Sequence, residues 1–131
     1  MYTDIVMEHF SNPRNVGRLE DADARGEAES GEDADVIAIY IKVQDDAIAA
    51  ITFQTFGCAA AIATGSMLTE LAMGKPLDEA GRITPQDVAG ALGGLPGWKA
   101  SCAQVACDAL RDAIARYRAI ARYRAQPGPG A

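Results

Sequence analysis

The sequence has few of the residues and motifs on which common catalytic sites depend. Its 131 residues include one histidine and three cysteines, with no Ser-His-Asp set, no P-loop and no dinucleotide-binding fingerprint. No segment approaches the roughly 18 apolar residues of a membrane span, and the opening MYTDIVMEHF does not resemble a secretory signal. An odd cysteine count without such a signal does not suit a disulfide framework. We therefore expect a cytoplasmic, reducing setting with free thiols.

Positive charge is scarce over most of the chain. Residues 1–110 carry seventeen acidic and seven basic side chains, a net of −10, whereas residues 111–131 carry five arginines and one acid, a net of +4. The overall charge of −6 argues against non-specific binding of nucleic acid. The basic segment is either a solvated helix face or a surface that guides a partner onto one end of the molecule.

The hydrophobic pattern predicts an α+β fold in a single domain, residues 1–125, with a disordered tail at 126–131. Two runs rich in β-branched residues, at 35–43 and 47–56, predict a hairpin. Residues 17–34 show no periodicity and are expected to form a mobile segment before the sheet. Helical segments are expected at 2–10, 58–73, 76–80, 85–92 and 101–124.

Apolar residues at helical spacing predict which helix faces are buried. The last helix is expected to bury Ala106, Leu110, Ala113, Tyr117 and Ile120, and the first helix Ile5, Val6 and Phe10.

Two cysteines occupy similar positions in the predicted fold. Cys58 follows Gly57 at a strand-to-helix junction, and Cys102 opens the last helix after a Gly/Pro-rich loop. Unpaired N–H groups at helix starts favour a thiolate, and Lys99 adds positive charge near Cys102. We predict that the two form one reactive thiol site for metal or sulfur. By position alone they could equally be two small buried hydrophobic residues.

Other candidate ligands are less specific. Asp33 and Asp35 lie two residues apart before the first predicted strand, so both carboxylates can face one side and complete a metal site. From the residues alone, a solvated acidic loop is the favoured explanation. Cys107 lies about 140° round the helix from the preceding cysteine and is expected in the core. His9 is expected in the core or on the surface rather than at a metal.

Three segments together resemble the signature motifs of the IscU / SufU / NifU-N-terminal family of iron–sulfur cluster scaffolds. They are EHFSNPRNVG at 8–17, TFGCAAAIATGSMLTELAMGK at 55–75 and LPGWKASCAQVACDALRDAI at 95–114. The segments follow the family's order, and the chain is identified as a member on this combination.

The resemblance implies a fold and a function. The fold would be a small antiparallel sheet with helices packed on one face and a long C-terminal helix. The protein would be a scaffold rather than an enzyme. It would receive sulfur from a cysteine desulfurase and iron from a donor, build a transient [2Fe–2S] cluster and pass it to apo acceptor proteins. Some members hold zinc instead.

The family's ligands carry over residue by residue, with departures. Its second and third cysteines fall on Cys58 and Cys102, and its aspartate falls on Asp35. By resemblance, Cys102 is the candidate sulfur acceptor. The first cysteine is replaced by Asp33, and the histidine before the last cysteine by Ser101.

These departures change what is expected. The chaperone-recognition stretch Leu-Pro-Pro-Val-Lys reads LPGWK at 95–99, so the resemblance does not extend to docking of an Hsp70-type chaperone. A carboxylate is a harder ligand than a thiolate, so Asp33 predicts a more labile cluster, or iron or zinc held by Asp33, Asp35, Cys58 and Cys102. The alternative is a divergent paralogue that builds no cluster and acts as a desulfurase-binding sulfur relay or regulator.

Overall fold

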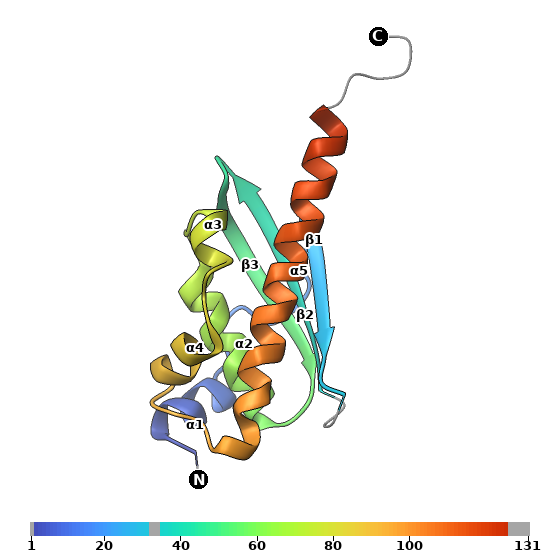
Figure 1. Ribbon diagram of the computed structural model, residues 1–131. Helices are drawn as coiled ribbons and strands as arrows, with labels where there is room; N and C mark the ends of the chain where they lie inside the picture. The colour runs from blue at the N-terminus through green and yellow to red at the C-terminus, as the bar shows by residue number, and fades with distance from the viewer. Residues whose placement is uncertain (1, 32–34, 126–131) are drawn as a thin grey trace.

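The computed structural model describes residues 2–31 and 35–125. A three-stranded sheet lies behind two helices that run along it, and the shorter helices lie along the left side in this view (Figure 1). The elements are α1 (Asp4–Ser11), β1 (Ala24–Glu29), β2 (Val36–Gln44), β3 (Ala47–Phe56), α2 (Ala59–Ala72), α3 (Leu77–Ala80), α4 (Pro85–Ala91), the 3₁₀ turn η1 (Gly97–Lys99) and α5 (Ala100–Ala125). No helix among the described residues is long and apolar enough to cross a membrane. The predicted tail at 126–131 lies outside the described residues.

The sheet is antiparallel with strand order β1-β2-β3. The β2–β3 hairpin confirms the prediction, and its turn residues Asp45 and Asp46 both have positive φ, as a tight primed turn requires. The inward-facing side chains are mostly β-branched, because such residues pack well on a pleated surface. Ile37, Ile39, Ile41 and Phe53 are at most 1% exposed and form the centre of the core.

The prediction of an irregular segment at 17–34 was wrong, because β1 occupies part of it. β1 carries small residues on its inner face, where α5 crosses very closely. A Cβ added at Gly26 would lie 2.2 Å from the backbone nitrogen of Ala113. Only a strand without side-chain bulk fits there, so β1 lacks the β-branched pattern by which strands are recognised.

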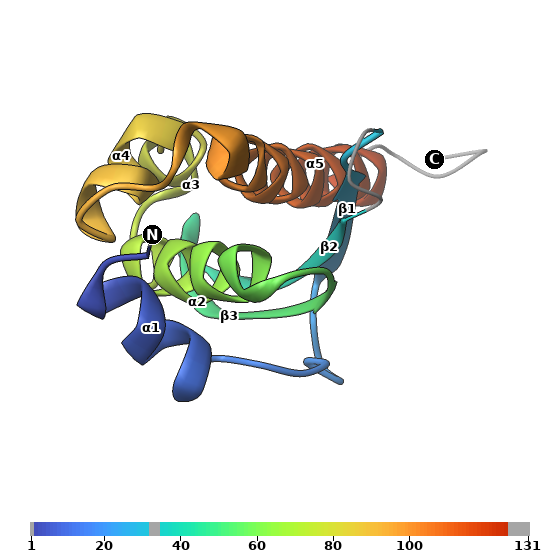
Figure 2. The ribbon, with the colours of Figure 1, turned by 90° about the horizontal axis from the view of Figure 1, so that it is seen from below.

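Helices α2 and α5 lie on the same side of the sheet, and α1 lies against α2 (Figure 2). Gly65 of α2 lies so close to β3 that an added Cβ would come within 2.5 Å of the Phe53 ring. α4 begins with the predicted Thr84–Pro85 start, where Thr84 and Asp87 form a reciprocal capping box. The expectation of an α+β sheet with helices on one face is confirmed.

Two predicted apolar stripes are only partly buried. On α5 the stripe holds from Ala106 to Ala113, but Ile120 is 39% exposed because the helix projects past the sheet (Figure 1). Of the predicted stripe on α1 only Val6 is buried, whereas Ile5 and Phe10 are about two-fifths exposed.

Candidate metal and sulfur site

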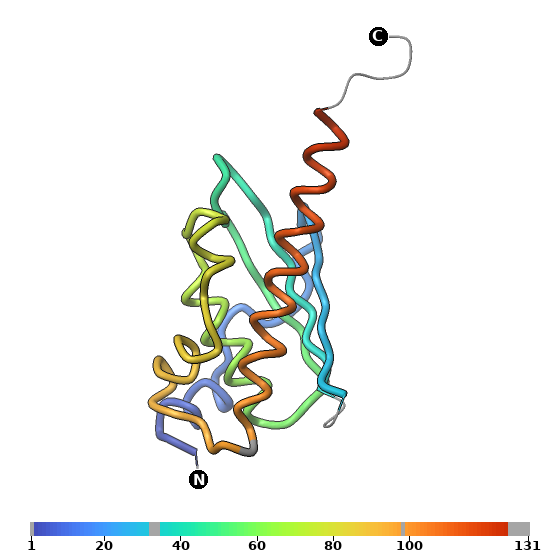
Figure 3. Tube along the Cα trace, viewed as in Figure 1, coloured from blue at the N-terminus to red at the C-terminus, as the bar shows by residue number. Residues whose placement is uncertain are grey.

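Three segments that are distant in sequence converge at one end of the molecule. The start of β2, the β3–α2 junction and the start of α5 lie near one another at the lower end of the chain trace (Figure 3). They bring together Asp35, just before β2, Cys58, the N-cap of α2, and Cys102, in the first turn of α5. The structure therefore brings Cys58 and Cys102 together, and their role as one reactive site for metal or sulfur stays a prediction.

The three ligand atoms fit a metal ion. One carboxylate oxygen of Asp35 and the sulfurs of Cys58 and Cys102 all lie within 4.8 Å of one another. Donor atoms around a tetrahedral zinc ion lie about 3.5–3.8 Å apart, as bond lengths near 2.3 Å for sulfur require. Small side-chain rotations would close that difference. The set offers two soft thiolates and one hard carboxylate, and it is the only group of three such ligands found among the described residues.

Gly57 allows the Asp35 carboxylate to approach the β3–α2 junction. A Cβ added at Gly57 would lie 2.7 Å from Oδ1 of Asp35 and 2.9 Å from the Cβ of Ala61. No other residue fits without moving that carboxylate. The glycine before Cys58 is thus a positioning residue for the neighbouring ligand.

The environment of Cys58 favours its thiolate. Partial burial by itself raises the pKa of this thiol, but hydrogen bonds to the sulfur from Ala61 N–H, the Lys99 side chain and Ala60 N–H outweigh it. The net pKa lies below the ordinary value of 9.0. The N-terminus of α2 and the lysine therefore produce a reactive, half-buried sulfur.

The environment of Cys102 has the opposite effect. Burial, the nearby Cys58 sulfur and a hydrogen bond to Asp35 raise its pKa to about 12. Its Sγ lies 3.5 Å from Oδ2 of Asp35, and the protonated thiol donates a hydrogen bond to that carboxylate. The prediction that Cys102 is also poised as a thiolate was wrong. Cys102 is 1% exposed, and Lys99 hydrogen-bonds the other site cysteine, Cys58.

Tyr2 also belongs to the site, and the sequence offered no sign of it. The pKa of Tyr2 is raised, first by burial and then by the negative charges of Cys58, Cys102 and Asp35, while Lys99 lowers it. Its ring packs against the small cluster that contains Cys102.

The residues after Tyr2 attach α1 to the rest of the fold. Thr3 caps α1 by accepting a hydrogen bond from Val6 N–H, and its hydroxyl donates to the carbonyl of Leu92. Tyr2 is not part of a periodic pattern in the sequence, so only the tertiary contact of Thr3 with Leu92 shows that Tyr2 lies at the site.

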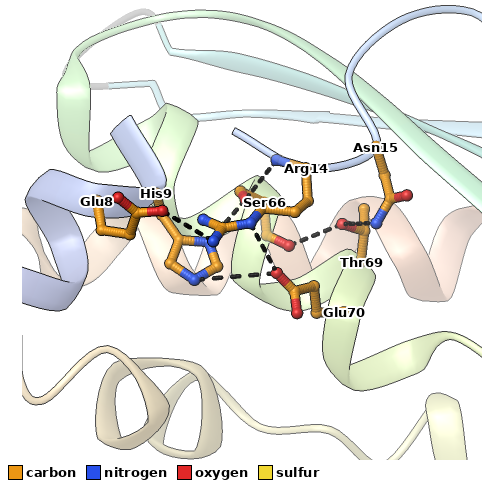
Figure 4. A network of polar contacts seen from close by, with 7 residues as sticks. All are labelled: Glu8, His9, Arg14, Asn15, Ser66, Thr69 and Glu70. Atoms are coloured by element: carbon orange, nitrogen blue, oxygen red, sulfur yellow. Dashed lines mark hydrogen bonds and ion pairs between the residues drawn. The ribbon is translucent and has the colours of Figure 1, made fainter. Parts of the chain in front are cut away.

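A polar network joins the N-terminal motif to α2 (Figure 4). The Ser66 hydroxyl accepts a hydrogen bond from Arg14 N–H, and it lies 2.7 Å from Nδ1 of His9. Arg14 pairs with Glu8 at 2.9 Å and with Glu70 at 3.4 Å. Burial and the Arg14 charge lower the pKa of His9, so the imidazole is neutral near pH 7.

The same motif continues along the open edge of β3. Asn15 donates from its side chain to Thr69, and its carbonyl accepts from Phe53 N–H, while Gly17 N–H donates to the Phe53 carbonyl. Asn15 and Gly17 both have positive φ, which explains the residue types at these positions. The motif therefore holds α1 and its neighbouring loop in place, and His9, 6% exposed, is buried within it.

The remaining predicted residues have different outcomes. Asp33 lies outside the described residues, so its role as a ligand stays a prediction. Cys107 is 1% exposed within the main core, and burial raises its pKa to about 11, which confirms it as a core residue. Ser101, in place of the family's histidine, is exposed at the start of α5.

Comparison with known proteins identifies the family. The model described as the NifU-like N terminal domain matches residues 1–124. The iron-sulfur cluster assembly scaffold protein IscU 1 of Archaeoglobus fulgidus is 57% identical over 117 residues, covering 89% of this chain and 76% of the relative. Aquifex aeolicus IscU is 43% identical over 118 residues, covering 88% and 75%. Azospirillum brasilense NifU is 46% identical over 121 residues, which are 89% of this chain but 39% of that longer protein.

Solved structures agree on the fold. The N-terminal NifU-like protein of Brucella abortus superposes with a TM-score of 0.72 at 19% identity, covering 89% of this chain and 94% of that chain. A SUF-system protein of Fervidobacterium islandicum gives 0.73 at 19%, covering 86% and 96%. The chain belongs to the NifU/IscU-like family of iron–sulfur cluster assembly scaffolds, which are not enzymes.

Proposed function

We propose that this protein is a scaffold on which iron and sulfur are assembled into a [2Fe–2S] cluster before transfer to apo acceptor proteins. The observation that carries the proposal is the convergence of Asp35, Cys58 and Cys102, with ligand atoms within 4.8 Å, in a chain of the scaffold family. Cluster iron prefers thiolate ligands, and the two cysteines supply them on rigid helix starts.

Asp33 is proposed as the fourth ligand. It occupies the position where the family resemblance expects a cysteine. Four thiolates favour a finished cluster, whereas mixed sulfur and oxygen ligands suit zinc or ferrous iron and hold a cluster more loosely. The proposed ligand set therefore favours quick release of the cluster.

A cysteine desulfurase is the proposed sulfur source, and a separate donor supplies iron. In the transfer step, a cysteine thiolate of the scaffold attacks the outer sulfur of the desulfurase persulfide. The sulfur–sulfur bond of the donor breaks, the donor cysteine leaves as a thiolate, and a persulfide remains on the scaffold. Cys102 is the proposed acceptor by resemblance, and its burial and raised pKa mean that it must first be uncovered and lose its proton.

A sulfur relay or regulator that builds no cluster is the second candidate. Two observations favour it: the carboxylate at position 33 in place of a thiolate, and the thiolate-favouring environment of Cys58. A relay needs one reactive sulfur, whereas a scaffold needs the whole ligand set.

Anaerobic reconstitution tests the proposal. The protein is incubated with ferrous iron, cysteine, a desulfurase and a dithiol that reduces persulfide sulfur to sulfide. Thiolate-to-iron absorption, bound iron and acid-labile sulfide are measured. Cys58→Ser and Cys102→Ser should lose the absorption, whereas Cys107→Ser, the matched core variant, should keep it. Asp33→Cys should slow cluster loss to a chelator.

The outcomes separate the two candidates. Absence of iron, zinc and sulfide from the wild type would refute the scaffold. A persulfide on either site cysteine without iron would support the relay, and mass spectrometry would show which cysteine carries it.

A further inference from the structure

The outer half of α5 carries a row of arginines that the proposed function does not use. Arg111, Arg118 and Arg122 are separated by seven and four residues, so they lie within about 40° of one another around the helix. They stand about 10 Å and 6 Å apart along its axis. No acidic residue follows Asp112 in the sequence, so the row ends in an uncompensated basic tip.

The row borders a surface groove between α5 and the segment after α3. The groove has a volume of about 320 Å³ and is lined by Gly81, Arg111, Ile114, Ala115, Arg118 and Arg122. Ile114 is 4% exposed and Gly81 has no side chain, so the floor is apolar and the rim is basic.

Two of the arginines are held in place before any partner arrives. Arg111 donates from Nε to the carbonyl of Gly81 at 3.1 Å and from Nη2 to the carbonyl of Ile83 at 3.2 Å. Arg118 donates from Nη2 to Asp78 at 2.6 Å. The Arg111 guanidinium, held by neutral carbonyls, loses little side-chain entropy when it binds an anion, whereas Arg118 exchanges Asp78 for the incoming carboxylate.

We propose that this α3–α5 groove docks an acidic amphipathic helix of a partner protein. Carboxylates spaced by four and seven residues on such a helix would meet the arginines, and an apolar side chain between them would cover Ile114. The net charge of −10 on residues 1–110 disfavours the alternative of a long nucleic acid, whose phosphates would extend over the acidic remainder of the surface.

A designed peptide tests the groove. The probe is a fluorescent helix with glutamates spaced by four and seven residues and leucines between them, and its control is a scrambled peptide of the same composition. Binding is measured by anisotropy at low and moderate salt. Arg118→Gln/Arg122→Gln should weaken binding about tenfold, as expected for two partly exposed charge pairs. Arg116→Gln/Arg124→Gln removes the same charge from other faces of α5 and should change binding less than twofold.

Several results would overturn the proposal. One is an equal loss of binding in the two double variants, and another is no binding of the probe at all. A third is binding of the scrambled peptide, of single-stranded DNA or of phosphatidylserine vesicles as tightly as the probe. Self-association that the groove variant abolishes would point to a second copy as occupant and overturn it too. Circular dichroism checks folding, and Arg122→Gln alone, at an exposed position, replaces the double variant if that variant unfolds.

Discussion

The two site cysteines should differ sharply in reactivity in the metal-free protein. At about pH 7.5, a pKa below 9.0 leaves at least roughly 3% of Cys58 as thiolate, whereas a pKa of about 12 leaves about 0.003% of Cys102. The thiolate fractions thus differ at least about 1000-fold. The less basic thiolate is the weaker nucleophile, which offsets part of that difference and leaves Cys58 at least about 30-fold faster at equal access. Because Cys102 is 1% exposed, the measured ratio should be larger still.

The assay is timed reaction of metal-free protein with an aromatic disulfide reagent, followed by peptide mass spectrometry of each thiol. Cys107, which is 1% exposed with a pKa raised to about 11, is the internal standard for a buried thiol. Asp35→Asn should speed the reaction of Cys102 modestly, since burial contributes more to its pKa than the carboxylate does. Modification of Cys102 as fast as Cys58 in the wild type would refute the assigned environments.

Three further predictions concern the metal and the single histidine. Gly57→Ala, whose Cβ would lie 2.7 Å from Oδ1 of Asp35, should weaken Co²⁺ binding at least about tenfold by absorption titration. Gly90→Ala is the control: its added Cβ would meet nothing within 4 Å, so it should leave Co²⁺ affinity unchanged and raise the free energy of unfolding by up to about 1 kcal/mol. Equal Co²⁺ affinities in the two variants would contradict the role of Gly57. Because Cys102 releases a proton on binding, Co²⁺ affinity should rise at least about tenfold per pH unit between about pH 6 and 8, and a flat profile would show a pre-formed thiolate. By NMR, the titration midpoint of His9 should lie below 6.5. Because the pKa is lowered in the folded state, the unfolded state binds more protons, and the free energy of unfolding in urea should fall as the pH drops below 6.5. An unshifted His9 midpoint would refute its buried setting.

The fold could be predicted wherever a segment's own side chains carry the pattern. β2 and β3 are rich in β-branched residues, and α4 begins with a capping box. β1 was not predicted because its small residues, including Gly26, are required by the close approach of α5, a helix more than eighty residues further along the chain. Likewise, helical periodicity identified the inner face of α5 but could not tell where the sheet ends, which leaves Ile120 exposed.

The sequence by itself identified the candidate ligands, the secondary-structure elements that carry them and the family. These are local features: a glycine before Cys58, a loop before Cys102 and an aspartate before β2. The structure places each of them at the predicted element boundary. Only the tertiary structure decided how the two thiols differ. Lys99, three residues from Cys102 in sequence, hydrogen-bonds Cys58, and Asp35 accepts a hydrogen bond from the Cys102 thiol. Thiol pKa values depend on burial and on charges a few ångströms away, and those neighbours come from segments that only folding brings together.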